Sequence, residues 1–274
     1  MEGMQVSFPK PGRALKVMLA LLAIVGIGGS LLANYGPKSI FGYLVVVPGE
    51  IVHHPWTVLT GPLVTNPTSW GHLIFSLLGL YFLGPPLEAN WGTARFVRFV
   101  VLSALAGTGL ALLLAAIAPE NVRAFHPELM MGPGAVLAAL AVAWGREHAN
   151  AQIRLFFFLP LSGRSFVWVT LGFCVLGLVY PSGIPEGVAA PFGGFVTGLL
   201  LSGTPSPLRA LYLRTKLALL RGKSPSGRGE LLARPAAPKR PRPGAPPLRV
   251  VQGGLDDEEL LKRRTPPKDK RYLN

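Results

Sequence analysis

Long intervals without a charged residue divide this chain of 274 residues. Four of these intervals are 21 or 22 residues long, one is 37 residues long and one is 17 residues long. A helix needs about 20 consecutive apolar residues to cross the hydrocarbon core of a membrane. The pattern therefore predicts six membrane segments, in the intervals Lys16 to Lys38, Glu50 to Glu88, Arg98 to Glu120, Glu128 to Arg146, Arg164 to Glu186 and Glu186 to Arg209.

Composition agrees with a membrane protein, because 50% of the residues are hydrophobic and only 15% are charged. We predict an all-α polytopic membrane protein whose six-helix bundle occupies residues 14–203. The first apolar stretch is too long for a signal peptide and lacks a small-residue cleavage site, so we expect it to be retained. Long spans are expected at Trp70–Leu87, Phe96–Ala118 and Phe166–Tyr180.

The distribution of Lys and Arg predicts the orientation in the membrane. Basic residues precede the first segment and lie between segments two and three and segments four and five, whereas Lys38 and Arg123 lie in the opposite loops. Cytoplasmic loops are enriched in such residues, so both termini, including residues 1–13, are expected in the cytoplasm. For a bacterial chain the membrane would be the plasma (inner) membrane. The residues that set this orientation are Lys10, Arg13, Lys16, Arg95, Arg98, Arg146 and Arg154.

The region after the last segment carries most of the net charge, since residues 204–274 contribute +11 of the total +14. Residues 204–223 are expected to form a basic amphipathic helix on an anionic lipid surface. Residues 224–274 are proline-rich and are expected to be a disordered tether, in which LDDEELLKRR is a candidate contact for a soluble partner. Nucleic acid is not an expected partner, because no aromatic residues interleave the charges. The cations that would face the lipid are Arg209, Arg214, Lys216, Arg221 and Lys223.

The stretch ELMMGPGAVLAALAVAWG, residues 128–145, places a Gly-Pro-Gly turn inside an apolar run. Proline lacks an N–H and suits the first position of a helix, so we predict that a helix begins at about Pro133. From Gly134 to Gly145 this helix would be roughly 18 Å long, against a hydrocarbon core of about 30 Å. We therefore expect a short helix that other helices enclose.

Several short motifs follow one another in a fixed order between Trp56 and Leu201. They are WTVLT at residues 56–60, HLIFS at residues 72–76, GPPLE at residues 84–88, MGPGAV at residues 131–136 and APFGGFVTG at residues 190–198. Together these motifs resemble the rhomboid family of intramembrane serine proteases, which has W-x-x-L-T, H-L-x-x-N, G-x-x-L-E, G-x-S-G-A-V and A-H-x-G-G-x-x-x-G at these places. The family's simplest form has six spans with both ends in the cytoplasm, as predicted here.

The resemblance implies acyl transfer by a serine and a histidine. In the family, the serine at the start of a short fourth helix meets a histidine of the sixth span in a water-filled cavity. The alignment puts Pro133 at the nucleophile and Pro191 at the general base, and proline offers neither a nucleophilic atom nor a transferable side-chain proton. His72 keeps one donor of the family's oxyanion pair, and Ser76 replaces the asparagine. We therefore predict no catalytic residue.

Candidate binding residues remain around the family's site. The glycines among them also have a packing interpretation, because small residues four apart let helices approach closely. Structural roles are expected for Ser103, Cys174 and Thr197, which have no histidine at a helical spacing. His53 and His54 with His72 do not have the spacing typical of a metal site, so neither a metal nor a cofactor is expected. The candidate binding residues are His72, Ser76, Gly132, Gly134, Gly193 and Gly194.

The functional hypothesis is a rhomboid-like pseudoprotease. It would bind transmembrane segments or membrane-protein clients and affect their trafficking, assembly or degradation. The alternative is an active intramembrane serine endopeptidase that uses displaced groups, which requires a hydroxyl or thiol about 2.6–3.2 Å from a histidine nitrogen. A channel or transporter is disfavoured, because the predicted spans are almost free of ionisable residues.

Overall fold

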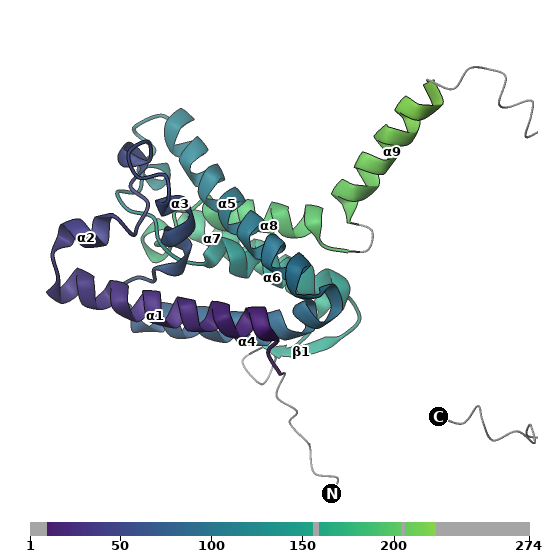
Figure 1. Cartoon of the computed structure of the whole chain (residues 1–274), viewed down its shortest axis with the longest axis horizontal. Coiled ribbons are helices and arrows are strands. Elements are labelled where there is room, and N and C mark those ends of the chain that lie inside the picture. Colours follow the sequence, from purple (N-terminus) through teal and green to yellow (C-terminus); the bar gives the residue numbers. More distant parts are fainter. Residues whose placement is uncertain (1–9, 156–158, 204–205, 223–274) are drawn as a thin grey trace, which may run out of the picture. The chain divides into compact units, whose positions relative to one another are not determined.

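The computed structural model describes residues 10–155, 159–203 and 206–222. Within these ranges the regular secondary structure is helical, apart from one two-stranded hairpin and an isolated bridge, and turns and irregular segments connect the helices (Figure 1). The predictions for residues 1–9, for the Lys223 side chain and for the tail at residues 224–274 lie outside the described residues.

In the described part of the chain, three helices are long and apolar enough to cross a membrane. They are α1 (Arg13–Tyr35, 23 residues), α4 (Trp70–Trp91, 22 residues) and α5 (Thr93–Ile117, 25 residues), and at 1.5 Å per residue each exceeds about 30 Å. Figure 1 shows α1 alongside α4, and the two helices pack together. The long spans predicted at Trp70–Leu87 and Phe96–Ala118 are thus confirmed as helices of sufficient length.

The three remaining bundle helices are shorter. They are α6 (Gly134–Glu147, 14 residues), α7 (Gly163–Val179, 17 residues) and α8 (Ala190–Leu201, 12 residues). The segment Phe166–Tyr180 lies largely within the helix α7, but the prediction that this helix is a long span is wrong. With 17 residues α7 extends only about 25 Å, which is less than the membrane core of about 30 Å. The prediction for α6 is confirmed: it is short, begins directly after Pro133 and packs against α4, α5, α7 and α8.

Short helices fill the connection between α1 and α4. They are α2 (Lys38–Gly42), η1 (Pro48–Glu50), α3 (Thr57–Thr60) and η2 (Gly61–Leu63). Two side chains tie this connection to itself: the Trp56 indole donates to the Tyr43 carbonyl at 3.0 Å, and the Thr60 hydroxyl donates to the Leu44 carbonyl at 2.8 Å. Two further single turns occur beyond it, η3 (Arg123–Phe125) and η4 (Pro181–Gly183).

A β-hairpin between α6 and α7 corrects the prediction that the fold is all-α. Strands β1 (Gln152–Leu155) and β2 (Leu159–Ser162) pair antiparallel, with Gln152 opposite Ser162. The segment QIRLFFFLPLS contains three phenylalanines and one isoleucine and lies between Asn150 and Gly163, and aromatic and β-branched residues between such turn formers favour a strand pair. The sequence analysis had treated this segment as a loop between membrane segments.

Glycines bring α8 close to α6 and α5. A Cβ on Gly198 would lie 2.8 Å from the Ala139 carbonyl oxygen, and one on Gly194 would overlap the Ala135 carbonyl. A Cβ on Gly193 would lie 2.6 Å from the carbonyl oxygen of Ala106 in α5. The predicted packing role of these small residues is therefore confirmed, since side chains of any size would force the helices apart.

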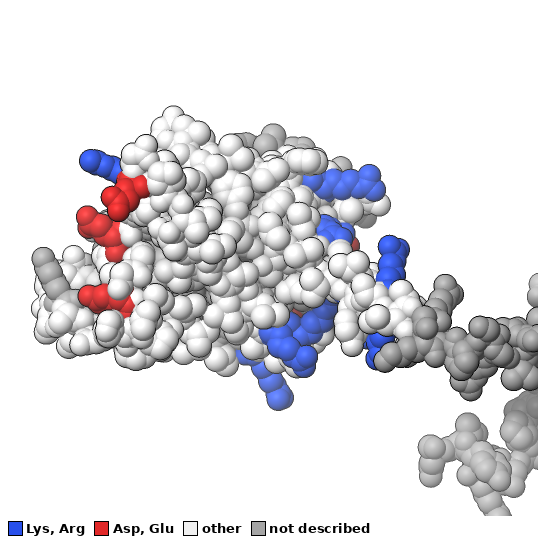
Figure 2. Space-filling view, turned by 90° about the horizontal axis from the view of Figure 1, so that it is seen from above, with Lys and Arg blue, Asp and Glu red and all other residues white. Residues whose placement is uncertain are grey.

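The two ends of the bundle differ in charge. Figure 2 shows most of the visible Lys and Arg side chains toward one end and Asp and Glu side chains at the other, where one basic side chain also lies. The first turns of α1 and α5 lie at the same end, because Glu88 hydrogen-bonds to both, and they carry Arg13 and Arg95. Glu120 and Glu128 belong to the connection that follows the opposite end of α5.

The helix α9 (Pro207–Gly222) agrees with the helix predicted over residues 204–223. Its apolar side chains are exposed, at 49% for Leu208, 62% for Leu211, 61% for Tyr212 and 70% for Leu219. A helix with this much uncovered apolar surface beside basic residues is typical of an interfacial helix.

Candidate functional site

Backbone hydrogen bonds from three separate segments fix the turn that leads into α6. This turn has Gly132 with a φ of +125°, a region that favours glycine, and then Pro133 at the N-cap. Because Pro133 has no N–H, the first free donor of α6 is the backbone N–H of Gly134. The bonds that hold the turn join Met130 with Val46, the Met131 N–H with the Pro185 carbonyl at 2.9 Å, and the Gly132 N–H with the Gly61 carbonyl at 3.0 Å.

A buried carboxylate caps the start of α6. One oxygen of Glu186, Oε1, accepts the Gly134 N–H at 3.0 Å and also lies 3.1 Å from Nε2 of His72. Glu186 is only 8% exposed. The amino end of a helix carries a partial positive charge and free N–H donors, so an anionic side chain is stabilised there.

The hydrogen bonds of His72 define its tautomer. Its Nδ1 accepts the backbone N–H of Asn66 at 3.0 Å, so this nitrogen carries no proton. The proton of the neutral ring therefore resides on Nε2, which donates to the Glu186 carboxylate. Both ring nitrogens are thereby engaged, and His72 has no nitrogen left to accept a proton from a nucleophile.

Two glycines make room for the Glu186 carboxylate. A Cβ on Gly132 would lie 2.7 Å from Glu186 Oε1 and 2.7 Å from the His72 ring, and one on Gly134 would lie 2.5 Å from Glu186 Oε1. Real Cβ atoms do not approach other atoms this closely, so the carboxylate fits only because both positions lack a side chain. Three of the predicted binding residues, His72, Gly132 and Gly134, therefore meet around Glu186.

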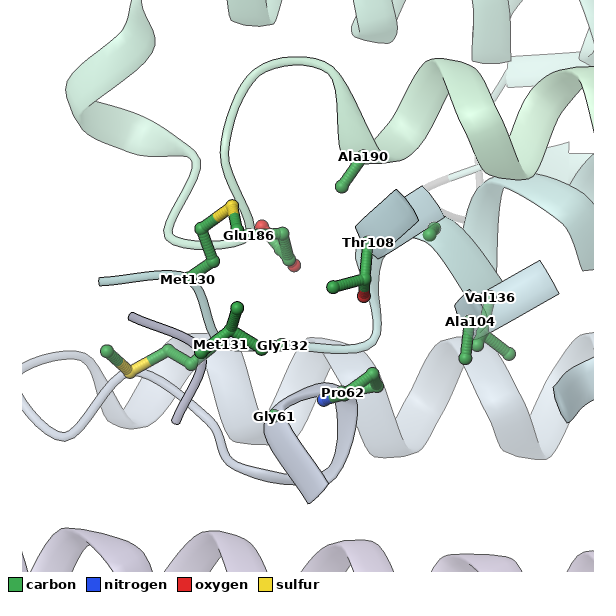
Figure 3. Close-up of a pocket in the computed structure, with 12 residues that line it drawn as sticks. Gly61, Pro62, Ala104, Thr108, Met130, Met131, Gly132, Val136, Glu186 and Ala190 are labelled. Atoms are coloured by element: carbon green, nitrogen blue, oxygen red, sulfur yellow. The ribbon is translucent and has the colours of Figure 1, made fainter. Parts of the chain in front are cut away.

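The cavity next to this carboxylate is small. Its volume is about 10 Å³, which is at the lower limit for one water molecule. Figure 3 shows Glu186 and Thr108 on its walls, with Met130 and Met131 on one side and Ala190 at the start of α8 on another. The cavity has no space for a polypeptide bond.

The two prolines stand at the positions where the helices begin. Pro133 is buried at the N-cap of α6, and Pro191 is buried in the first turn of α8. The α8 residue that lines the small cavity is Ala190. The predicted binding residues Gly193 and Gly194 lie one turn further along α8, where they contact α5 and α6 rather than the cavity.

The hydroxyl groups of the apolar spans bond back to their own helices, as the structural role predicted for Ser103 and Thr197 requires. Ser76 donates to the His72 carbonyl at 2.6 Å, Ser103 to the Phe99 carbonyl at 2.8 Å and Thr197 to the Gly193 carbonyl at 2.7 Å. This bonding to the preceding turn is common for Ser and Thr in helices. Among the described residues, no side-chain hydroxyl or thiol hydrogen-bonds to a histidine ring.

The histidines do not gather into a metal site. His54 packs against Tyr43 and Trp56, whereas His72 faces Glu186. No group of three His, Cys, Asp or Glu side chains in the described part of the chain is placed to hold a metal ion.

A second buried carboxylate repeats the arrangement at the opposite end of the bundle. Glu88, which is 5% exposed, accepts the N–H groups of Ala14 and Leu15 at 3.0 and 3.1 Å and thereby caps α1. The Thr93 hydroxyl at the start of α5 donates to the same carboxylate at 3.3 Å. Glu88 is the last residue of the GPPLE motif, so this motif residue joins three helices.

Glu186 is a site residue that the motifs do not predict, and in the charge pattern it marks only a boundary between apolar intervals. A signal was present, because Glu186 is the single charged residue between Arg164 and Arg209. An ionisable residue within an apolar region is costly and is therefore a functional or structural candidate by default. Its partners come from α4 and from the turn before α6, which are remote in sequence.

These features define a helical membrane-protein bundle in which a short enclosed helix begins at a buried polar centre. A model of the rhomboid domain matches residues 53–207, more than half of the chain. The chain belongs to the rhomboid family, and with its apolar helices it is an integral membrane protein. It is also similar to rhomboid-like protein 19 of Arabidopsis thaliana, with 30% identity over 125 residues that cover 44% of this chain and 40% of that protein. The chain thus spans well under half of that relative.

Proposed function

We propose that this chain is a rhomboid pseudoprotease, without hydrolytic activity at the family's site. One observation carries the proposal: the first free N–H of α6, at Gly134, is already bonded to the Glu186 carboxylate. In the family this helix start holds the nucleophile, and here it holds Pro133. The site therefore combines the absence of a nucleophile with an anion resident at the helix terminus.

The resident carboxylate opposes the family's reaction on electrostatic grounds. Acyl transfer develops a negative oxygen that must find unoccupied, preorganised donors, each worth about 3 to 4 kcal/mol. Here the Gly134 N–H and His72 Nε2–H both donate to Glu186 Oε1. A developing oxyanion would meet a fixed negative charge in place of free donors.

The proposed role is binding of transmembrane segments or membrane-protein clients, whose trafficking, assembly or degradation the protein would influence. The close packing of α8 on α6 and α5 supports this role. It keeps the bundle intact although the serine and histidine of the family are absent, so the fold is available for a binding function. The alternative, an endopeptidase with displaced groups, finds no support in the hydrogen bonding of the described residues. Their hydroxyls bond to backbone carbonyls, to a carboxylate, to an amide oxygen or to one another, and none of them bonds to a histidine ring.

The proposed topology has six spans with both termini in the cytoplasm. The separation of charge between the two ends of the bundle supports it, since the basic end would face the cytoplasm. The shorter helices α7 and α8 would cross with help from their neighbours and from local thinning of the bilayer. The helix α9 would follow the last span and lie on the anionic inner surface.

A reconstituted binding assay tests the proposed function. The protein and a fluorescent single-span substrate of the rhomboid type are placed in liposomes. Energy transfer between the two proteins reports binding, and the length of the recovered substrate reports cleavage. We expect saturable transfer and full-length substrate, with weaker transfer to a polyleucine span of equal length. Cleaved substrate, or transfer no greater than with polyleucine, would contradict the proposal.

A further inference from the structure

An apolar groove of about 530 Å³ lies between α1 and α5 and ends at Pro133 and Val136, on the opposite side of the α6 start from the small cavity that Glu186 and Ala190 line. Aliphatic side chains form almost all of its lining, with Val17 and Leu21 from α1, Val97 and Val101 from α5, and Pro62 from η2. The polar exceptions are Arg13 and Thr93, which begin α1 and α5. Both lie at one end of the groove, because Glu88 hydrogen-bonds to the first turn of each helix.

The dimensions of the groove match one leaflet of a membrane. Its lining on α1 runs from Arg13 to Leu22, a rise of about 14 Å, and half of the hydrocarbon core is about 15 Å. A helix of 10–12 Å diameter occupies roughly 420–610 Å³ per turn, so the groove would hold about one turn. It is therefore too small for a spanning helix. Its lining of branched side chains also differs from the small residues typical of helix interfaces.

The charge at the end of the groove indicates an anionic ligand. The Arg13 side chain is exposed and forms no ion pair with the described residues. The carboxylate of Glu88, close by, is engaged by the N–H groups of Ala14 and Leu15, and no acidic residue lines the groove. A guanidinium group binds phosphate through paired hydrogen bonds.

We propose that the groove between α1 and α5 binds an anionic phospholipid, with one acyl chain along the aliphatic lining and the phosphate at the Arg13 guanidinium. The lipid belongs to the leaflet on the Arg13 side of the bundle. This site is separate from the helix α9 and does not depend on whether the protein hydrolyses or binds a client.

Native mass spectrometry of the purified protein with phosphatidylglycerol or phosphatidylcholine tests the site. We expect one phosphatidylglycerol to be retained in preference to phosphatidylcholine, and Arg13→Gln to weaken its retention about five-fold, since one cation near an anionic headgroup contributes about 1 kcal/mol. The matched control is Lys16→Gln, which removes an equal charge one turn along α1 at an exposed residue outside the groove lining. Equal losses in both variants would overturn the proposal.

A second pair of variants tests the apolar part of the groove. Val97→Trp fills it and should abolish retention of the bound lipid, whereas Leu113→Trp, at an exposed position of α5 outside the groove, should leave retention unchanged. A photoreactive residue at position 97 should crosslink to phospholipid in membranes. Crosslinking to a protein segment, or unchanged retention in Val97→Trp, would overturn the proposal.

Discussion

Replacement of Glu186 should reveal how much the carboxylate contributes to the α6 start. Glu186→Ala removes the single oxygen that accepts both the Gly134 N–H and His72 Nε2–H, and leaves two partly buried donors without this acceptor. Glu186→Gln retains an oxygen at the same place, so both donors keep an acceptor and only the charge is lost. The two variants therefore separate hydrogen bonding from charge.

The magnitudes follow from the two hydrogen bonds. A donor left unpaired costs about 1 to 3 kcal/mol, so the loss of an acceptor for two donors in Glu186→Ala should lower the free energy of unfolding by about 2 to 6 kcal/mol. A hydrogen bond to a charged group stabilises the fold by roughly 1 kcal/mol more than a hydrogen bond between neutral groups. Glu186→Gln should therefore lower the free energy of unfolding by about 1 to 2 kcal/mol. His72→Ala removes one of the two donors, so the cost of Glu186→Ala should be smaller in that background.

Equilibrium unfolding in bicelles measures these differences, with Glu128→Gln as the control for loss of an exposed acidic side chain. The expected order of stability is wild type, then Glu186→Gln, then Glu186→Ala, with the control equal to wild type. Two results would refute the reasoning. Either a Glu186→Ala variant as stable as wild type, or a Glu186→Gln variant as unstable as Glu186→Ala, would mean that Oε1 does not hold these donors.

Two further predictions concern packing and the helix α9. Gly194→Ala should destabilise the bundle by about 3 kcal/mol, because the added Cβ overlaps the Ala135 carbonyl. Gly172 faces open space, so Gly172→Ala should not destabilise the bundle. Equal effects of the two variants in the same unfolding assay would contradict the packing account. A peptide spanning residues 207–223 should bind anionic vesicles in preference to neutral ones, and Arg214→Gln with Lys216→Gln should weaken binding about 30-fold at low salt; equal binding to neutral vesicles would exclude the electrostatic contribution.

Much of the bundle could be predicted from the sequence, because charge spacing and proline act locally. The helix starts at Gly134 and Ala190 follow from the fixed φ and missing N–H of Pro133 and from the position of Pro191 in a first turn. The glycines of α8 were likewise recognisable by their spacing. The hairpin before α7 was missed because its apolar residues were interpreted as part of a loop rather than by their strand propensity.

The centre of the site could not be predicted in the same way. The contacts of Glu186 join the connection between α7 and α8 to α4 and to the first residue of α6, and no local pattern specifies such a meeting. The hydroxyl of Ser76 illustrates the converse, because sequence alignment placed it in an oxyanion role while its geometry directs it to the His72 carbonyl. The direction of the Ser76 side chain within its helix decides which group it bonds to, and a comparison of motifs contains no information about that direction.

The central claim is that the family's hydrolytic chemistry is absent from this chain. Its most direct test is to incubate the wild-type protein in proteoliposomes with a rhomboid-type transmembrane substrate and with a fluorescent fluorophosphonate, beside an active rhomboid protease in the same liposomes. The account predicts intact substrate and no labelling of this chain. Cleavage or labelling that is lost on Ser76→Ala or Thr108→Ala would contradict it, because a hydroxyl of this chain would then be a nucleophile.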